Sequence, residues 1–255
     1  MVLRKVLLSL CALSWLTSLE GWFWFKKDPE PEQIEKPKVQ PRIFTLMIHP
    51  ADSHTPRAIE DIFERTITLE CAQDIKRMLE NRIPGVYVVL TRSTAEVVEP
   101  LQCASFANKL NVDFYISLHF YQSSVKVPKL YLYHMLYNPV IDFWQTRESE
   151  LSLMPYDKAY RNNIKKTQAW GSRMLESLKG FSGLSCQGLF GIPFRPLKGV
   201  LAPALGIECS VKKKEDYRLF VEPLVTALHV IIKQFEPERK DDTLTQTFPL
   251  PSHIN

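Results

Sequence analysis

The chain of 255 residues is long enough for one or two domains, and its 45% hydrophobic and 24% charged residues are typical of a globular protein. Its net charge of +4 is too small to indicate nucleic-acid binding, and its lysines and arginines are scattered rather than grouped with aromatic residues. The composition therefore predicts a globular protein with no nucleic-acid partner.

The amino-terminal segment has the pattern of an export signal. Arg4 and Lys5 precede an apolar run at residues 6–16, as in a secretory signal peptide. Residues 17–21 contain no clear cleavage site, and the aromatic residues 22–25 extend the apolar run to about the 20 residues that span a bilayer. We expect residues 1–27 to be a signal peptide or an uncleaved membrane anchor formed by residues 6–25. In both cases the rest of the chain is exported.

Two further segments are predicted to lie outside the folded part. Residues 28–41 are rich in proline and charge, which is typical of an extended linker. Residues 237–255 show little periodicity and are predicted to form a disordered tail. The folded domain is therefore expected to span residues 42–236.

Apolar runs and helical periodicity alternate through this domain. The predicted strands lie at residues 43–48, 86–92, 114–119, 130–136 and 204–207, and the predicted helices at 67–79, 100–110, 156–178 and 216–235. This alternation predicts an α/β fold, with a single domain whose mainly parallel sheet is flanked by helices.

Several candidate functional residues stand where predicted elements end or begin. His119 ends the predicted strand 114–119, and ligands bind at the carboxyl ends of strands in open α/β sheets. His49 ends the first strand. Glu208 follows the strand 204–207, where an unpaired buried carboxylate would be costly. Glu64 begins a predicted helix, where an acidic residue also favours the helix dipole. A hydrolytic zinc site needs about three such ligands and a separate carboxylate that moves a proton.

Five short motifs in the same order resemble the zinc-dependent N-acetylmuramoyl-L-alanine amidases, which cleave the bond between glycan and peptide in bacterial cell walls. They are Glu64-Arg65-Thr66-Ile67-Thr68-Leu69, Leu90-Thr91-Arg92, Ala107-Asn108, Ser117-Leu118-His119 and Pro203-Ala204-Leu205-Gly206-Ile207-Glu208, the last resembling Pro-Ala-Val-Leu-Val-Glu in the family. The resemblance runs from about residue 43 to residue 232 and implies an amidase-like fold.

The resemblance also implies roles for these residues. Glu64 and His119 would be ligands of Zn²⁺, and Glu208 would be the general base in hydrolysis of the amide bond between N-acetylmuramic acid and L-alanine. Peptidoglycan would be the substrate, and the protein would lie in the periplasm or on the outer face of the inner membrane. The resemblance leaves the residues that bind the substrate unknown.

The first metal-ligand motif departs from the family. The family has Asp-Pro-Gly-His-Gly-Gly after the first strand, whereas this chain has His49-Pro50-Ala51-Asp52-Ser53-His54. We expect His54 to be the third ligand, with Asp52, which aligns with the family's histidine, as the alternative. The same departure leaves open a catalytically inactive protein that keeps the fold and binds cell wall or acts as a scaffold.

Overall fold

The computed structural model of the protein describes residues 44–51, 57–93, 97–136 and 155–245. The predicted signal or anchor segment, the linker, Asp52 and His54 lie outside these residues. In the part of the chain that is described, no helix has both the length and the apolar character needed to cross a membrane.

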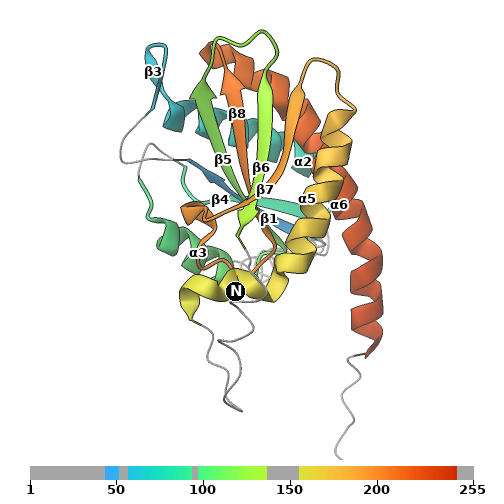
Figure 1. The fold of residues 1–255 in the computed structure, drawn as a ribbon. Helices are drawn as coiled ribbons and strands as arrows, with labels where there is room; N and C mark the ends of the chain where they lie inside the picture. Colours follow the sequence, from blue (N-terminus) through green and yellow to red (C-terminus); the bar gives the residue numbers. More distant parts are fainter. Residues whose placement is uncertain (1–43, 52–56, 94–96, 137–154, 246–255) are drawn as a thin grey trace, which may run out of the picture. The chain divides into compact units, whose positions relative to one another are not determined.

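One six-stranded sheet forms the centre of the fold, in the order β4-β1-β5-β8-β6-β7 (Figure 1). Its strands are β1 (Phe44–Pro50), β4 (Val86–Leu90), β5 (Phe114–Gln122), β6 (Lys129–Met135), β7 (Ser185–Ile192) and β8 (Ala204–Val211). The strands β4, β1, β5 and β8 are parallel, whereas β6 runs antiparallel to β8 and parallel to β7. The predicted α/β fold with a mainly parallel sheet flanked by helices is confirmed.

Most helices pack on one face of the sheet. The helices are α2 (Glu64–Arg82), α3 (Pro100–Lys109), α5 (Ile164–Lys179) and α6 (Arg218–Thr245), and three 3-10 turns are η2 (Tyr156–Asn163), η3 (Arg195–Leu197) and η4 (Lys214–Tyr217). The apolar side chains of β5 and β8 that point to α2, α5 and α6 are buried: Ile116, Leu118, Phe120, Leu205, Ile207 and Cys209. Burial of this stripe, at about 25 cal/mol per Å² of apolar surface, holds the helices on the sheet.

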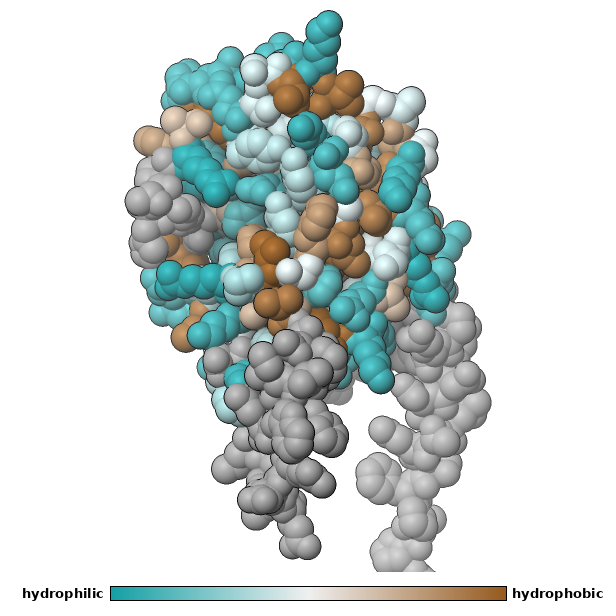
Figure 2. All heavy atoms as spheres, viewed as in Figure 1, coloured by the Kyte–Doolittle hydropathy of each residue, from teal (hydrophilic) through white to brown (hydrophobic). Residues whose placement is uncertain are grey.

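The opposite face is covered differently along its length. A smaller cluster, which includes Met47, Cys103, Tyr115, Leu197 and Ala204, packs α3 and η3 against the amino-terminal halves of β5 and β8. Towards the carboxyl halves of these strands, the same face carries polar and aromatic side chains that are partly exposed. Hydrophilic and hydrophobic residues are interspersed over this side of the molecule (Figure 2).

Several element boundaries differ from those predicted. The predictions that strands end at His119 and at Ile207 are wrong, because β5 continues to Gln122 and β8 to Val211. The predicted helix 156–178 begins as the 3-10 turn η2 and becomes an α-helix at Ile164. The helix α6 continues to Thr245, into the segment predicted to be disordered.

The strand β7 was not predicted from the sequence. Its residues Ser185–Ile192 include two glycines, which β-strands disfavour, and its side chains are mostly half-exposed. Hydrogen-bonded pairing with β6 along its whole length therefore stabilises β7, although its own residues do not favour a strand.

Candidate active site

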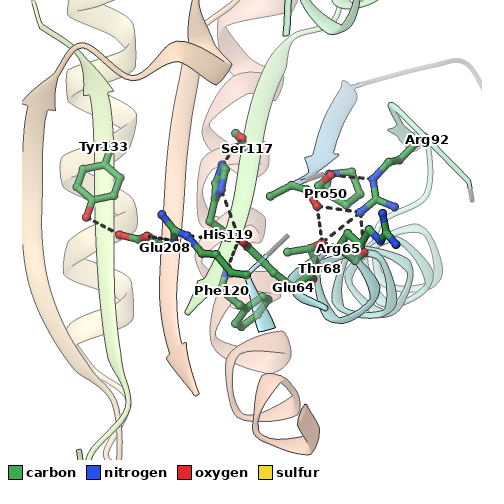
Figure 3. A network of polar contacts seen from close by, with 12 residues as sticks. Pro50, Glu64, Arg65, Thr68, Arg92, Ser117, His119, Phe120, Tyr133 and Glu208 are labelled. Atoms are coloured by element: carbon green, nitrogen blue, oxygen red, sulfur yellow. Dashed lines mark hydrogen bonds and ion pairs between the residues drawn. The ribbon is translucent and has the colours of Figure 1, made fainter. Parts of the chain in front are cut away.

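The register of β5 and β8 brings two of the predicted site residues together. His119 and Glu208 are paired neighbours on these parallel strands, so their side chains leave the same face of the sheet. Both residues lie inside their strands rather than at the ends. Tyr131 of β6 lies opposite Glu208. Figure 3 shows His119 and Glu208 side by side, with Tyr133 beyond Glu208 and Glu64 beyond His119.

Glu64, the first residue of α2, points its carboxylate into this site. The side chain is only 4% exposed, and its Oε1 accepts a hydrogen bond from the backbone N–H of Phe120 at 3.0 Å. The same oxygen lies 3.5 Å from Nδ1 of His119. Because a buried carboxylate is costly without polar partners, these contacts hold Glu64 in one place.

The geometry of Glu64 and His119 fits two ligands of one zinc ion. Donors at 2.0–2.2 Å from a tetrahedral zinc lie about 3.4 Å from each other, close to the distance between Oε1 and Nδ1. The other ring nitrogen of His119, Nε2, lies 2.8 Å from the hydroxyl of Ser117. Zinc-binding histidines usually have such a partner, which fixes the orientation of the ring. No group of three donors suited to a metal occurs among the described residues, and both candidates for the third ligand lie outside them.

Both carboxylate oxygens of Glu208 have a partner. Oε1 lies 3.0 Å from the guanidinium of Arg57, and Oε2 accepts a hydrogen bond from the hydroxyl of Tyr133 at 2.9 Å. Burial and then the bond to Glu208 raise the pKa of Tyr133 well above its usual value, so Tyr133 stays a donor. The Glu208 side chain is still 22% exposed, so the carboxylate is oriented but accessible.

A short hairpin places Arg57 at the site. The strands β2 (Ala58–Ile59) and β3 (Ile62–Phe63) pair antiparallel, and the backbone N–H of Glu64 donates to the carbonyl of Arg57 at 2.8 Å. Burial opposes the charge of Arg57, but the hydrogen bond to Glu208 and the charge of Glu64 raise its pKa overall. The sequence did not indicate Arg57, because strands of two residues leave no periodic signal.

Arg92 joins the end of β1 to the first turns of α2. Its buried guanidinium donates to the carbonyls of Pro50, Ala51 and Arg65 at 3.0, 2.9 and 2.6 Å, and to the hydroxyl of Thr68 at 3.2 Å (Figure 3). Arg92 therefore fixes the helix start that carries Glu64. This contact gives the Leu90-Thr91-Arg92 motif a structural role.

Phe194 is a further residue that sequence reasoning missed. Its ring lies edge-on to His119, with 5.2 Å between the ring centroids, and 5.4 Å from the ring of Tyr133. A Cβ atom on Gly206 would lie 2.4 Å from Cε1 of Phe194, so any larger residue at that position would require the ring to move. Phe194 thus fills the space between the metal-ligand candidate His119 and the Tyr133–Glu208 pair.

His49 is buried beside the site. Its Nδ1 lies 2.9 Å from the hydroxyl of Thr91 and 3.5 Å from Sγ of Cys103. Burial, followed by the nearby His119, lowers the pKa of His49 to about 3. The imidazole is therefore neutral at ordinary pH.

Comparisons with known proteins agree with this fold. A family model described as N-acetylmuramoyl-L-alanine amidase matches residues 49–226, which is more than half of the chain. No curated protein matches the chain.

Solved structures of amidases share the fold at low sequence identity. The catalytic domain of CwlV, an N-acetylmuramoyl-L-alanine amidase from Bacillus (Paenibacillus) polymyxa var. colistinus, is 16% identical with a TM-score of 0.55, over 74% of this chain and 98% of that one. An N-acetylmuramoyl-L-alanine amidase from Clostridium difficile 630 is 15% identical with a TM-score of 0.52, over 75% and 98%. AmiC2 of Nostoc punctiforme is 15% identical with a TM-score of 0.52, over 79% and 99%. These likenesses concern the fold, and the family model extends over the site residues Glu64, His119 and Glu208, so the chain belongs to the N-acetylmuramoyl-L-alanine amidase family.

Proposed function

We propose that the protein is a zinc-dependent hydrolase that cleaves the amide bond between N-acetylmuramic acid and L-alanine in peptidoglycan. The observation that carries the proposal is the position of the Glu208 carboxylate beside the Glu64–His119 pair on a partly exposed face of the sheet. Membership of the amidase family supports the same reaction class.

The residues of the site divide the chemistry between them. Glu64 and His119, together with His54 or Asp52, would hold the zinc ion, whose contribution when bound is to activate water near neutral pH. Glu208 would accept a proton from the attacking water and return it to the leaving amine. Arg57 and Tyr133, which contact the two oxygens of Glu208, orient this carboxylate.

The location of the substrate supports an exported protein. Peptidoglycan lies outside the inner membrane, and the charged and apolar residues 1–27 have the pattern of an export signal. We infer that the domain acts in the periplasm or on the outer face of the inner membrane, either released or anchored through residues 6–25.

The reaction is tested with the full-length protein, zinc and purified peptidoglycan. We expect about one zinc ion per chain by elemental analysis and the release of stem peptides that begin with a free L-alanine amino group, detected by mass spectrometry. A zinc-loaded protein that binds peptidoglycan but releases no stem peptide would instead support the non-catalytic wall-binding role. Absence of stoichiometric zinc after supplementation would contradict the zinc site.

The third ligand is tested by comparing two alanine variants. His54→Ala should weaken zinc binding by more than the factor of about 10–100 that loss of a partner hydrogen-bonded to a ligand typically costs, and Asp52→Ala should weaken it much less. The reason is that imidazole is the donor that the family uses here. Competition with a chromophoric chelator measures both affinities. A larger loss for Asp52→Ala would assign the role to the aspartate.

A further inference from the structure

Arg57 lies between the two carboxylates of the site. Its terminal nitrogen is 3.0 Å from Oε1 of Glu208, and its Nε is 4.0 Å from Oε2 of Glu64. One cation of the chain therefore contacts Glu208, the residue expected to act as base, and approaches Glu64, a residue expected to bind zinc.

The charges explain why a cation is favourable at this position. The Glu64 side chain is almost fully buried, and a buried carboxylate without a positive partner is strongly destabilising. Arg57 supplies part of the compensating charge that a metal ion would supply. When a divalent ion is also present, a guanidinium about 4 Å from one of its ligands repels it.

We propose that Arg57 is a built-in counter-ion that stabilises the metal-free site and competes with zinc for it. This inference rests on the proposed function. The two cations are coupled through Glu64, so the stabilisation by Arg57 that zinc binding removes is subtracted from the zinc affinity. Zinc binding would turn the guanidinium away from Glu64 and leave it on Glu208.

The surroundings of Arg57 allow this movement. Its backbone is held next to Glu64 by the β2–β3 hairpin, but its side chain is 54% exposed. The guanidinium can therefore turn away from Glu64 and stay hydrated and in contact with Glu208, while the hairpin keeps it close enough to return.

Replacing Arg57 by glutamine tests the proposal through zinc affinity rather than activity. Arg57→Gln should bind zinc about tenfold more tightly than the wild type, which corresponds to about 1.4 kcal/mol. Competition with a chromophoric chelator at low ionic strength measures the affinity of the full-length protein. The difference should shrink at high salt, because salt screens partly exposed charges.

Thermal unfolding gives a second readout that needs no substrate. Without zinc, Arg57→Gln should unfold at a lower temperature than the wild type, because Glu64 and Glu208 lose their counter-ion. With saturating zinc, the rise in unfolding temperature should be larger for the variant, since tighter binding stabilises the folded state more.

Arg65→Gln is the matched control. It removes the same charge from the residue next to Glu64, but the guanidinium of Arg65 lies over the ring of Phe63, 5.0 Å from its centroid. Its zinc affinity should stay within about twofold of the wild type. Figure 3 shows Arg65 on the side of Glu64 away from Glu208.

The outcomes separate this inference from the proposed function. An Arg57→Gln variant that binds zinc no more tightly than the wild type overturns the counter-ion role and leaves the zinc site intact. An equal gain in Arg65→Gln also overturns it, because a general charge effect would then explain the result. If the wild type and both variants all fail to bind zinc, both the zinc site and the role of Arg57 are overturned.

Discussion

Glu208→Gln is expected to abolish the release of stem peptides from peptidoglycan while the protein still binds zinc. The amide keeps the shape of the side chain, and its oxygen can still accept the hydrogen bond from Tyr133, but it cannot take up a proton. Loss of general base catalysis costs roughly 10²–10⁴-fold in rate. The measurement compares the initial rates of wild type and variant on purified peptidoglycan, with zinc content determined on the same samples.

Glu222→Gln is the control for this substitution. Glu222 is an exposed carboxylate of α6 whose partner is Arg82, so the variant makes the same chemical change away from the site. We expect it to retain wild-type turnover. Rapid turnover by Glu208→Gln would remove Glu208 from the mechanism, whatever its zinc content.

Replacement of Arg92 by methionine is expected to lower the stability of the domain strongly. Methionine fills a similar volume but donates no hydrogen bonds, so the carbonyls of Pro50, Ala51 and Arg65 lose a buried donor. Unsatisfied buried acceptors of this kind should cost about 3 kcal/mol in total. For a domain of this size, that lowers the unfolding temperature by roughly 6–12 °C, measurable by circular dichroism. Arg92→Lys should retain only part of the stability that Arg92→Met loses, because an ammonium group lacks the planar fork of donors.

Arg82→Met provides the comparison for Arg92. Arg82 makes a bidentate ion pair with Glu222, at 2.8 and 2.6 Å, but both side chains are exposed to water. Exposed ion pairs contribute little to stability. We therefore expect Arg82→Met to unfold close to the wild-type temperature. If the two variants lose the same amount of unfolding temperature, the buried hydrogen bonds of Arg92 contribute no more to stability than an exposed ion pair does.

The parts of the fold that were predicted correctly have strong local signals. The strands β1, which is buried, and β4, which is partly buried, are continuous apolar runs, and α2 and α3 have helical periodicity with Glu64 and Pro100 at their starts. Such runs identify buried elements without knowledge of their partners. The meeting of His119 and Glu208 then follows from parallel strands in one sheet.

The carboxyl end of β8, beyond the predicted strand, shows an alternating pattern rather than a continuous apolar run. From Ile207 to Val211 the chain alternates between residues that face the core, Ile207, Cys209 and Val211, and polar residues that face the site, Glu208 and Ser210. A period of two is typical of a strand with one open face. The prediction stopped at the first charged residue, although the alternation continued past it.

Other features of the site depend on contacts that no local pattern reveals. Arg57 reaches Glu208 across 151 positions of sequence because a two-residue hairpin turns it back towards the sheet. Phe194 follows the unpredicted strand β7, and its position depends on pairing between β6 and β7. These residues are placed by tertiary contacts, so they could not be assigned from the sequence.

The contact between Gly206 and Phe194 has a consequence for which pairs of residues the fold accepts at these two positions. The pattern Pro-Ala-Val-Leu-Val-Glu, which residues 203–208 resemble, has leucine at the position of Gly206, and the ring of Phe194 lies where a side chain at that position would begin. A side chain at position 206 and the ring at position 194 would therefore occupy the same space. Among homologues, a large residue at one position should accompany a small residue at the other.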